Sequence, residues 1–334
     1  QNILKVLRLQ IIKRVNMNVA IVGGAGFIGR HTARELISHG HTVSILDIDL
    51  SNCHGFFNAV EMESLCLMHC DALDYDMLKS MLGYNARFDA VYMLAAISDS
   101  KENLADIPHA VNTNIMSLTN TLEVANDLKI PRIIFSSTVW VYSISPEVDV
   151  NEESSLYINS SDHIYTTCKV ACESLVRNFC AVKDLDYTIL RYGIAYGPGC
   201  HPDTVMSRFI TNAINDVPLT ITGDGNIYRN FLNVDDHARG NYLALCDGAK
   251  NETINLEGPE KITLTEVAER VKELHPGNVN VEYTGQRYGD YKGKVVDNKK
   301  AAAILGWKPT IDFETGSKTL YEYIKKDINN STAC

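Results

Sequence analysis

Three side chains in the middle of the sequence could move a proton and hold a reacting oxygen. Tyr165 and Lys169 are four residues apart, so on a helix they share one face, with their side chains about 6 Å apart. A tyrosine with an ordinary pKa near 10 is a poor base at neutral pH, but a neighbouring ammonium stabilises its phenolate. Thr138 follows a β-branched run and could hold the same substrate oxygen. A Tyr-x-x-x-Lys spacing alone is also compatible with a solvated helix face, and Thr138 favours the catalytic interpretation.

A glycine-rich turn near the start of the chain is typical of a dinucleotide site. Gly23, Gly26 and Gly29 follow a β-branched run directly and open a helical pattern. In such a turn the first glycine permits the tight bend, the second lets the backbone approach a pyrophosphate, and the third lets helix and strand pack closely. The free N–H groups and the dipole of the helix N-terminus then favour an anion. The pattern predicts dinucleotide binding.

Two aspartates at the ends of predicted strands indicate which dinucleotide binds. Asp47 closes the second strand, about twenty residues beyond the glycines. A carboxylate there accepts hydrogen bonds from a ribose diol and repels a 2′-phosphate, and neither Ile48 nor Asp49 supplies a cation for that phosphate. The sequence therefore favours NAD over NADP. Asp71 follows a third strand and could reach the adenine amino group, or it could cap the next helix.

The elements that must position these residues alternate between short β-branched runs and longer helical patterns. Such alternation predicts right-handed βαβ crossovers and a parallel sheet that binds ligands at the carboxyl ends of its strands. The predicted strands are Val19–Val22, Thr42–Leu46, Phe88–Leu94, Arg132–Ser136 and Tyr187–Leu190. The predicted helices are Ile28–Ser38, Asp74–Leu82, His109–Leu128 and Asp162–Val182.

After Gly193 the pattern of predicted elements changes: turn residues become frequent and the predicted strands become short. Phe231–Val234, with a helix from Asp235 to Leu245, is expected to return to the main sheet. We therefore predict an α/β fold: a Rossmann-type doubly wound parallel sheet with a smaller, discontinuous C-terminal substrate-binding lobe. The expected divisions are an upstream or added extension at 1–16, an NAD-binding domain at 17–193 plus about 226–255, and a substrate-binding lobe at about 194–225 plus 256–334.

Composition limits the classes of partner. The chain has 31 Lys plus Arg against 41 Asp plus Glu, a net charge of −10 that argues against nucleic acid or an anionic membrane as the main partner. No stretch approaches the roughly 20 apolar residues of a membrane span. The 9 cysteines lack C-x-x-C spacing, which is expected of reduced thiols in a cytoplasmic protein. Cys66, His69 and Cys70 lie close together, but no second ligand cluster follows, so we expect a buried strand there and no metal.

Several motifs occur in the order of the extended short-chain dehydrogenase/reductases. Within that group the chain resembles the NAD-dependent epimerase/dehydratase family, typified by UDP-glucose 4-epimerase, from Met17 to about Lys326. The motifs are Gly-Gly-Ala-Gly-Phe-Ile-Gly, Asp47, Asn114, Ser-Ser-Thr-x-x-Val-Tyr, Tyr-x-x-x-Lys, Leu190-Arg191-Tyr192 with Tyr196-Gly197-Pro198, Gly223-Asp224-Gly225 with Arg229, and Leu305-Gly306-Trp307-Lys308-Pro309.

The resemblance implies roles for individual residues. Thr138, Tyr165 and Lys169 would form the catalytic triad, with Lys169 also bonding the nicotinamide ribose. The substrate would be a nucleotide sugar, with a UDP-sugar as the first expectation, held by Thr138, Tyr165, Val205, Arg229 and Arg287; the two arginines would grip the diphosphate. NAD would be bound by Gly23, Gly26, Phe27, Ile28, Gly29, Asp47, Asp71, Ala72, Leu94, Ala95, Ala96, Asn114, Tyr165 and Lys169.

The resemblance also implies a homodimer in which the helices carrying Asn114 and Tyr165 pair as a four-helix interface. An apolar stripe on the second helix fits such burial; it consists of Cys168, Cys172, Leu175, Phe179 and Val182. Ile194 departs from the family pattern, because it stands where an asparagine usually contacts the substrate diphosphate.

The predicted reaction is 4-epimerisation through transient oxidation to a 4-keto sugar. A 4,6-dehydratase needs an extra acid and base beside the threonine, and Val139 and Trp140 cannot transfer that proton. The alternatives are a dehydratase or reductase on the same scaffold and a non-catalytic dinucleotide-binding scaffold. Lys294, seven residues after Arg287, either faces a charged sugar substituent such as a hexuronic acid carboxylate or lies in water.

Overall fold

The computed structural model describes residues 16–84, 87–157, 163–285 and 293–332. Its centre is a seven-stranded sheet in the order β12-β7-β5-β4-β1-β2-β3, and each neighbouring pair is parallel. The strands of this sheet are β1 (Asn18–Val22), β2 (Thr42–Asp47), β3 (Leu65–His69), β4 (Ala90–Met93), β5 (Arg132–Thr138), β7 (Asp186–Tyr192) and β12 (Glu252–Leu256).

The strand order is the doubly wound Rossmann arrangement with one further strand at the β12 edge. This confirms the predicted fold class. The chain reverses its direction of progress across the sheet between β1 and β4, which lie next to each other in register. In a sheet of this kind the ligand crevice lies outside the carboxyl ends of the strands at the reversal point. The glycine-rich turn and Thr138 both follow or end strands at that edge.

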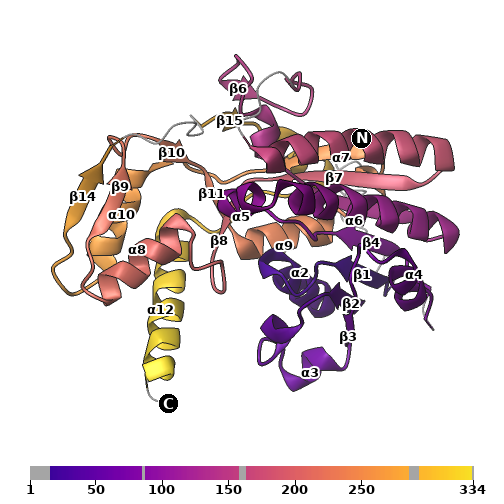
Figure 1. Cartoon of the computed structure of the whole chain (residues 1–334), viewed down its shortest axis with the longest axis horizontal. Coiled ribbons are helices and arrows are strands. Elements are labelled where there is room, and N and C mark those ends of the chain that lie inside the picture. Colours follow the sequence, from indigo (N-terminus) through magenta and orange to yellow (C-terminus); the bar gives the residue numbers. More distant parts are fainter. Residues whose placement is uncertain (1–15, 85–86, 158–162, 286–292, 333–334) are drawn as a thin grey trace, which may run out of the picture.

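Helices cover both faces of the sheet (Figure 1). One face carries α2 and α9, which pack on each other. Ala33 and Leu36 of α2, and Ala244 directly after α9, share a core cluster with inward residues of β1, β2 and β12. The other face carries α4, α6 and α7, which bury leucine, cysteine and valine side chains in a second cluster. The bounds are α2 (Phe27–Ser38), α4 (Tyr75–Gly83), α5 (Ser100–Ala105), α6 (Ile107–Asp127), α7 (Ile164–Lys183), α9 (Val234–Leu243) and α11 (Lys299–Leu305).

The second lobe lies beyond the carboxyl ends of the sheet, at the left of Figure 1. Its core is formed by apolar faces of three helices and by β9, which pairs in parallel with β14. These elements are α8 (Val205–Ile214), α10 (Leu264–Leu274), α12 (Phe313–Thr332), β9 (Leu219–Thr222) and β14 (Val281–Thr284). The remaining short elements are α3 (Ala59–Met62), β6 (Asp149–Val150), β8 (Ile194–Tyr196), β10 (Tyr228–Arg229), β11 (Phe231–Asn233), β13 (Ile262–Thr263) and β15 (Val295–Val296).

One expected strand is placed differently. Phe231–Val234 was expected to rejoin the main sheet, but β11 pairs with β8 (Ile194–Tyr196) in a separate two-stranded sheet. The return to the main sheet is made by α9, which packs on α2, and then by β12, which pairs with β7. A strand of three residues does not reveal its partner from the sequence, and β8 lies directly after β7 in the chain, so either strand could have been that partner.

The structure also bears on two cysteine segments. The segment around Cys66 was expected to be buried, but β3 is an edge strand and Cys66 is exposed while Cys70 is buried. The spacing of Cys168 and Cys172, one helical turn apart on an apolar face, predicts core packing, and the structure confirms it, because they are 2% and 0% exposed within their own chain. Leu175 on the same helix is 40% exposed. The outward part of α7 is therefore narrower than its apolar stripe suggests.

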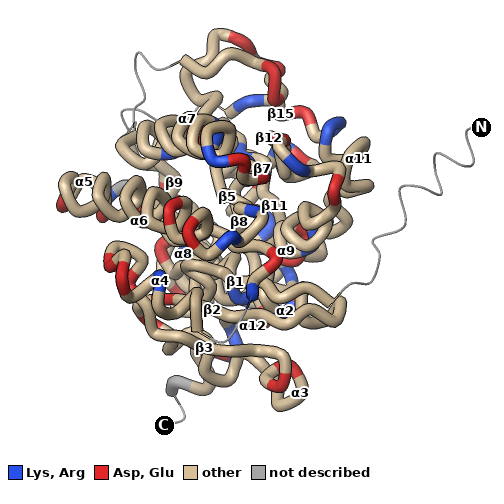
Figure 2. The backbone as a smooth tube through the Cα atoms, turned by 90° about the vertical axis from the view of Figure 1, so that its right-hand side faces the viewer, with Lys and Arg blue, Asp and Glu red and all other residues tan. Residues whose placement is uncertain are grey.

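The surface carries both signs of charge. In Figure 2 Lys and Arg are interspersed with Asp and Glu along the outer helices. Over the residues that the structure describes, none of the helices is long and apolar enough to cross a membrane.

Candidate active site

The turn between β1 and α2 can be made only of glycine at two of its positions. Gly23 has φ +79°, and a Cβ there would lie 2.3 Å from the backbone nitrogen of Ala95. A Cβ on Gly29 would lie 2.7 Å from the carbonyl oxygen of Gly23 and the Cα of Gly24. Both approaches are too short for any side chain, so the first glycine keeps the turn against β4 and the last keeps α2 against the turn.

The first turn of α2 presents its backbone N–H groups to a cavity. The residue that precedes the helix is Gly26, so no side chain caps these donors. Gly26, Phe27, Ile28 and Gly29 all line the cavity. Uncapped N–H groups at the positive end of a helix dipole form a site for a phosphate-like anion. The turn therefore fits the pyrophosphate of a dinucleotide.

Asp47 ends β2 beside this turn, as predicted. One carboxylate oxygen accepts a hydrogen bond from the backbone nitrogen of Ala25 at 3.0 Å. Burial raises the pKa of Asp47, opposed by hydrogen bonds from backbone amides. The contact with Ala25 links the carboxylate directly to the glycine-rich turn. Asp47 is thus held where it can meet the ribose of a dinucleotide seated on α2.

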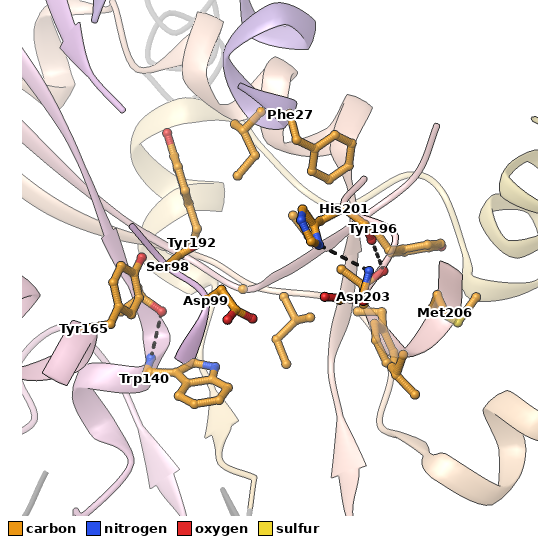
Figure 3. A pocket seen from close by; sticks show the side chains of 18 of the residues that line it. Phe27, Ser98, Asp99, Trp140, Tyr165, Tyr192, Tyr196, His201, Asp203 and Met206 are labelled. Atoms are coloured by element: carbon orange, nitrogen blue, oxygen red, sulfur yellow. Dashed lines mark hydrogen bonds between the residues drawn. The ribbon is translucent and has the colours of Figure 1, made fainter. Parts of the chain in front are cut away.

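A cavity of about 720 Å³ joins this turn to the second lobe (Figure 3). The predicted residues that line it are Gly23, Gly26, Phe27, Ile28, Gly29, Leu94, Ala96, Thr138, Tyr165, Lys169, Val205 and Arg229. The same cavity thus receives the glycine-rich turn, the three catalytic candidates and two substrate candidates. These residues come from segments that are far apart in the sequence and meet only in the fold.

The three catalytic candidates come from two neighbouring elements. Thr138 is the last residue of β5, and its hydroxyl oxygen accepts a hydrogen bond from the backbone nitrogen of Trp140 at 3.2 Å. Tyr165 lies in the first turn of α7 and Lys169 one turn later. The ammonium of Lys169 lies 5.5 Å from the centre of the Tyr165 ring and donates to the carbonyl oxygen of Ser136 at 2.7 Å. A hydroxyl, a phenol and an ammonium therefore face one cavity.

Burial controls the protonation of this pair. It lowers the pKa of Lys169 to about 8, because a buried ammonium is poorly solvated. It also raises the pKa of Tyr165, because a buried phenolate is disfavoured. We expected the ammonium to lower the pKa of Tyr165, and in the chain alone burial outweighs that effect. In the chain without a ligand, burial therefore favours the uncharged form of each group.

A buried ionic network holds α7 against the sheet behind these residues. Glu173, one turn after Lys169, accepts two hydrogen bonds from Arg191 on β7 at 2.8 and 2.7 Å. It also accepts one from the hydroxyl of Ser137 at 2.6 Å. Burial alone would raise the pKa of Glu173, but Arg191, Ser137 and Arg177 together lower it. The network ties the catalytic helix to both β5 and β7.

Several predicted residues lie outside the cavity lining. Asn114 is buried, and its side-chain amide forms two hydrogen bonds with the backbone of Ile97. The amide oxygen accepts from the Ile97 nitrogen at 2.8 Å, and the amide nitrogen donates to the Ile97 oxygen at 3.1 Å. It therefore positions the loop that follows β4. Asp71 is exposed and accepts a hydrogen bond from the nitrogen of Leu73. Neither Ala72 nor Ala95 lines the cavity. Arg287 lies outside the described residues.

Lys294 is partly exposed and is not among the described residues that line the cavity. Its ammonium donates to the carbonyl oxygens of Ser145 at 2.5 Å and Glu147 at 2.8 Å. These contacts tether β15, which pairs with β6, to the loop after Tyr142. The partial exposure agrees with the expectation that Lys294 lies in water, although two backbone carbonyls take up part of its donors.

The cavity also receives residues that the sequence analysis did not single out. Thr220 and Thr222 alternate on β9 and so face the same way, a period-two signal that the sequence contained. Arg208 lies on the first half of α8, and Ser98 and Asp99 lie on the loop after β4. Only the packing of the second lobe shows that these segments face the glycine-rich turn. The other lining residues of this group are Glu102, Gly193, Ala195, His201, Asp203, Thr204, Met206, Phe209, Phe231 and Leu264. Residues that the sequence analysis named in its motifs and alternatives also line the cavity, namely Ser136, Ser137, Trp140, Tyr192, Ile194 and Tyr196.

Comparison with known proteins gives relatives along most of the chain. The chain is 28% identical over 315 residues to the UDP-glucuronate 4-epimerase of Thermodesulfobacterium geofontis, covering 92% of this chain and 96% of that protein. It is 27% identical over 318 residues to a dTDP-glucose 4,6-dehydratase of Streptomyces niveus, covering 92% and 93%. Epimerases and dehydratases are thus similar to this chain at nearly the same level.

Solved structures agree with the fold. The UDP-glucose 4-epimerase of Thermotoga maritima, solved with UDP-glucose, superposes with a TM-score of 0.84 at 27% identity, covering 93% of this chain and 100% of that one. The UDP-glucuronic acid 4-epimerase of Bacillus cereus, solved with UDP-glucuronic acid and NAD, gives 0.83 at 27%, covering 93% and 99%. Residues 19–256 match the description "NAD dependent epimerase/dehydratase family". The chain therefore belongs to the NAD-dependent epimerase/dehydratase family, whose members modify nucleotide sugars.

Proposed function

We propose that this protein is an NAD-dependent nucleotide-sugar 4-epimerase. The observation that carries the proposal is the cavity itself, in which the uncapped turn of α2 and the group of Thr138, Tyr165 and Lys169 face each other. The seven-stranded part would bind NAD and the lobe of α8, α10 and α12 would bind the nucleotide. When bound, NAD accepts a hydride from the sugar and returns it to the other face of the keto sugar.

The residues of the chain supply the proton chemistry. The hydroxyl of Thr138 holds the oxygen on C4 of the sugar. The phenolate oxygen of Tyr165 removes the proton from that oxygen while a hydride leaves C4. The protonated Lys169 stabilises that phenolate through its charge and, once the nicotinamide ribose is present, holds a ribose hydroxyl. In the return step Tyr165 gives the proton back, so no second substrate is consumed.

The closest rival is a 4,6-dehydratase, since such enzymes are among the relatives. Elimination of water needs an acid and a base next to the reacting sugar. The two positions after Thr138 hold Val139, which is buried, and Trp140, which lines the cavity. Neither transfers a proton, and this favours the epimerase. A 4-epimerase product has the mass of the substrate, whereas a dehydratase product is lighter by one water.

The proposal is tested by incubating the purified chain with NAD and UDP-glucose. The products are separated by chromatography and their molecular masses are measured. We expect UDP-galactose with no change in mass. Tyr165→Phe should abolish turnover and leave NAD binding nearly unchanged, while Lys169→Ala should impair both. Tyr75→Phe is the matched control, because its hydroxyl bonds Asp127 at 2.7 Å outside the cavity. A Tyr165→Phe protein with near-normal turnover would refute the mechanism.

The proposed assembly is a homodimer through α6 and α7. Large apolar side chains on the outward faces support it: Ile107 and Met116 on α6 are each 42% exposed, and Val182 on α7 is 80% exposed. Apolar side chains repeated along two adjacent helices fit burial against a second copy. Light scattering of the purified chain would test this.

A further inference from the structure

The charged residues that line the cavity differ between its two ends. At the end formed by the second lobe they are Arg208, Arg229 and Asp203. At the end formed by the loop after β4 and by α5 they are Asp99 and Glu102, with Lys169 beside Tyr165. The second end adjoins Tyr165, where the sugar must react. The diphosphate of a nucleotide sugar therefore has cations to meet, and its sugar meets acids.

Asp99 points into the cavity on the side of the reacting residue. In Figure 3 its carboxylate points into the cavity that Tyr165, Trp140 and Phe27 also line. One carboxylate oxygen of Asp99 caps α5, accepting from the nitrogens of Lys101 at 2.8 Å and Glu102 at 2.9 Å. Within the described ranges the other oxygen has no hydrogen-bond partner. That oxygen is available to a ligand.

Two buried asparagine side chains hold the backbone of the loop that carries Asp99. Asn114 makes two hydrogen bonds to the backbone of Ile97, and Asn103 donates to the oxygens of Ile97 at 3.0 Å and of Asp99. Both asparagines are at most 3% exposed. These bonds fix the backbone on both sides of Ser98, and the cap of α5 orients the exposed Asp99 side chain that this backbone carries.

The cation nearest to Tyr165 is already engaged. Lys169 donates to the Ser136 carbonyl and faces the Tyr165 and Phe135 rings at 5.5 and 4.7 Å. Lys294, which we had considered as a partner for an acidic sugar, is bound to two carbonyl oxygens away from the cavity. A carboxylate on the sugar would therefore face Asp99 without a dedicated cation from either lysine.

We propose that Asp99, assisted by Glu102, selects nucleotide sugars whose sugar carries no acidic group and rejects hexuronic acids. This rests on the proposed function and names its substrate class. The free carboxylate oxygen accepts hydrogen bonds from hydroxyl or amino groups of a neutral or amino sugar. A sugar carboxylate in the same place is repelled.

The test compares UDP-glucose with UDP-glucuronic acid in three forms of the full chain loaded with NAD. Asp99→Asn keeps the helix cap, because asparagine caps as well as aspartate, and removes only the charge. Asp106→Asn is the matched control: Asp106 caps α6 by accepting from the nitrogen of His109 at 3.0 Å and does not line the cavity. For each form kcat/KM and the calorimetric Kd are measured for both sugars.

We expect the wild type to prefer UDP-glucose by both measures. Asp99→Asn should shift the ratio about tenfold toward UDP-glucuronic acid, the effect of removing one like charge about 6 Å away in a partly solvated site. Glu102→Gln should shift it in the same direction, and Asp106→Asn should leave it unchanged. A wild-type preference for UDP-glucuronic acid, or an unchanged ratio in Asp99→Asn, overturns the inference.

The two proposals fail in different ways. If neither sugar turns over but both bind, the epimerase proposal falls. The Kd ratio then still decides on Asp99, because charge repulsion acts on binding whether or not a reaction follows. If turnover proceeds and the Asp99→Asn ratio stays at the wild-type value, the epimerase stands and the selection by Asp99 falls.

Discussion

Glu173→Gln should destabilise the protein strongly although it changes one atom. The substitution keeps the shape of the side chain and removes its charge, which leaves Arg191 buried without a counter-ion; Arg191 is 2% and Glu173 0% exposed. Breaking a buried ion pair by removing one partner costs about 3–5 kcal/mol. For a chain of 334 residues the entropy of unfolding is about 0.7 kcal/mol/K, so Tm should fall by about 4–7 °C.

The assay is thermal unfolding followed by circular dichroism, with Arg177→Gln as the matched control. Arg177 bonds the same carboxylate at 2.8 Å, but its side chain is 36% exposed, so its loss should cost at most about 1 kcal/mol. Equal shifts in the two variants would refute the argument that burial sets the cost.

The dependence on pH gives a second check of the same reasoning. The pKa of Glu173 is lowered in the folded chain, so the stabilisation it provides is complete above its unfolded value near 4.3 and is lost as pH falls through the lower folded value. Protonated Glu173 resembles glutamine in shape and charge. The difference in stability between wild type and Glu173→Gln should therefore shrink in strongly acidic solution. A difference that stays constant down to acid unfolding would contradict the assignment of the charge.

Two further predictions concern the cofactor and the catalytic lysine. NAD should raise Tm well beyond NADP in a thermal-shift titration, because the Asp47 carboxylate repels a 2′-phosphate, and equal shifts would rule this out. The pKa of Lys169 is lowered to about 8, so its charge is present below that pH and lost above it, and kcat/KM should fall on the alkaline side of pH 8. Lys169→Arg, if active, should move that decline upward, because a guanidinium stays charged; a decline at the same pH would assign it to another group.

Much of the fold and the cofactor turn could be read from the sequence. The strands and helices whose bounds were predicted between Val19 and Leu190 agree with the structure to within about two residues, because β-branched runs and helical periodicity are local signals. The short helices α3 and α5 had no predicted bounds. The turn from Gly23 to Gly29 was predictable because its glycine spacing directly after a strand and before a helix is a local signal, although the approach of Gly23 to Ala95 is a long-range contact. The meeting of Thr138, Tyr165 and Lys169 in one cavity was predictable, because the order of elements alone brings β5 and α7 to one edge of a parallel sheet.

Only the tertiary structure decided what lies across the cavity. Asp99, Arg208 and the threonines of β9 have no chemical signature in the sequence. Asp99 reaches the cavity because the loop after β4 is fixed by buried asparagines, and Arg208 and the threonines reach it because the second lobe packs against the carboxyl ends of the strands. Lys294 shows the converse, since its position in the sequence suggested a substrate contact and a distant loop took its hydrogen bonds instead. The direction in which the pKa of Tyr165 shifts was also decided by the tertiary structure, because burial of its ring raises that pKa. Spacing along the chain reports which groups share an element, whereas burial and long-range contacts depend on segments that only folding brings together.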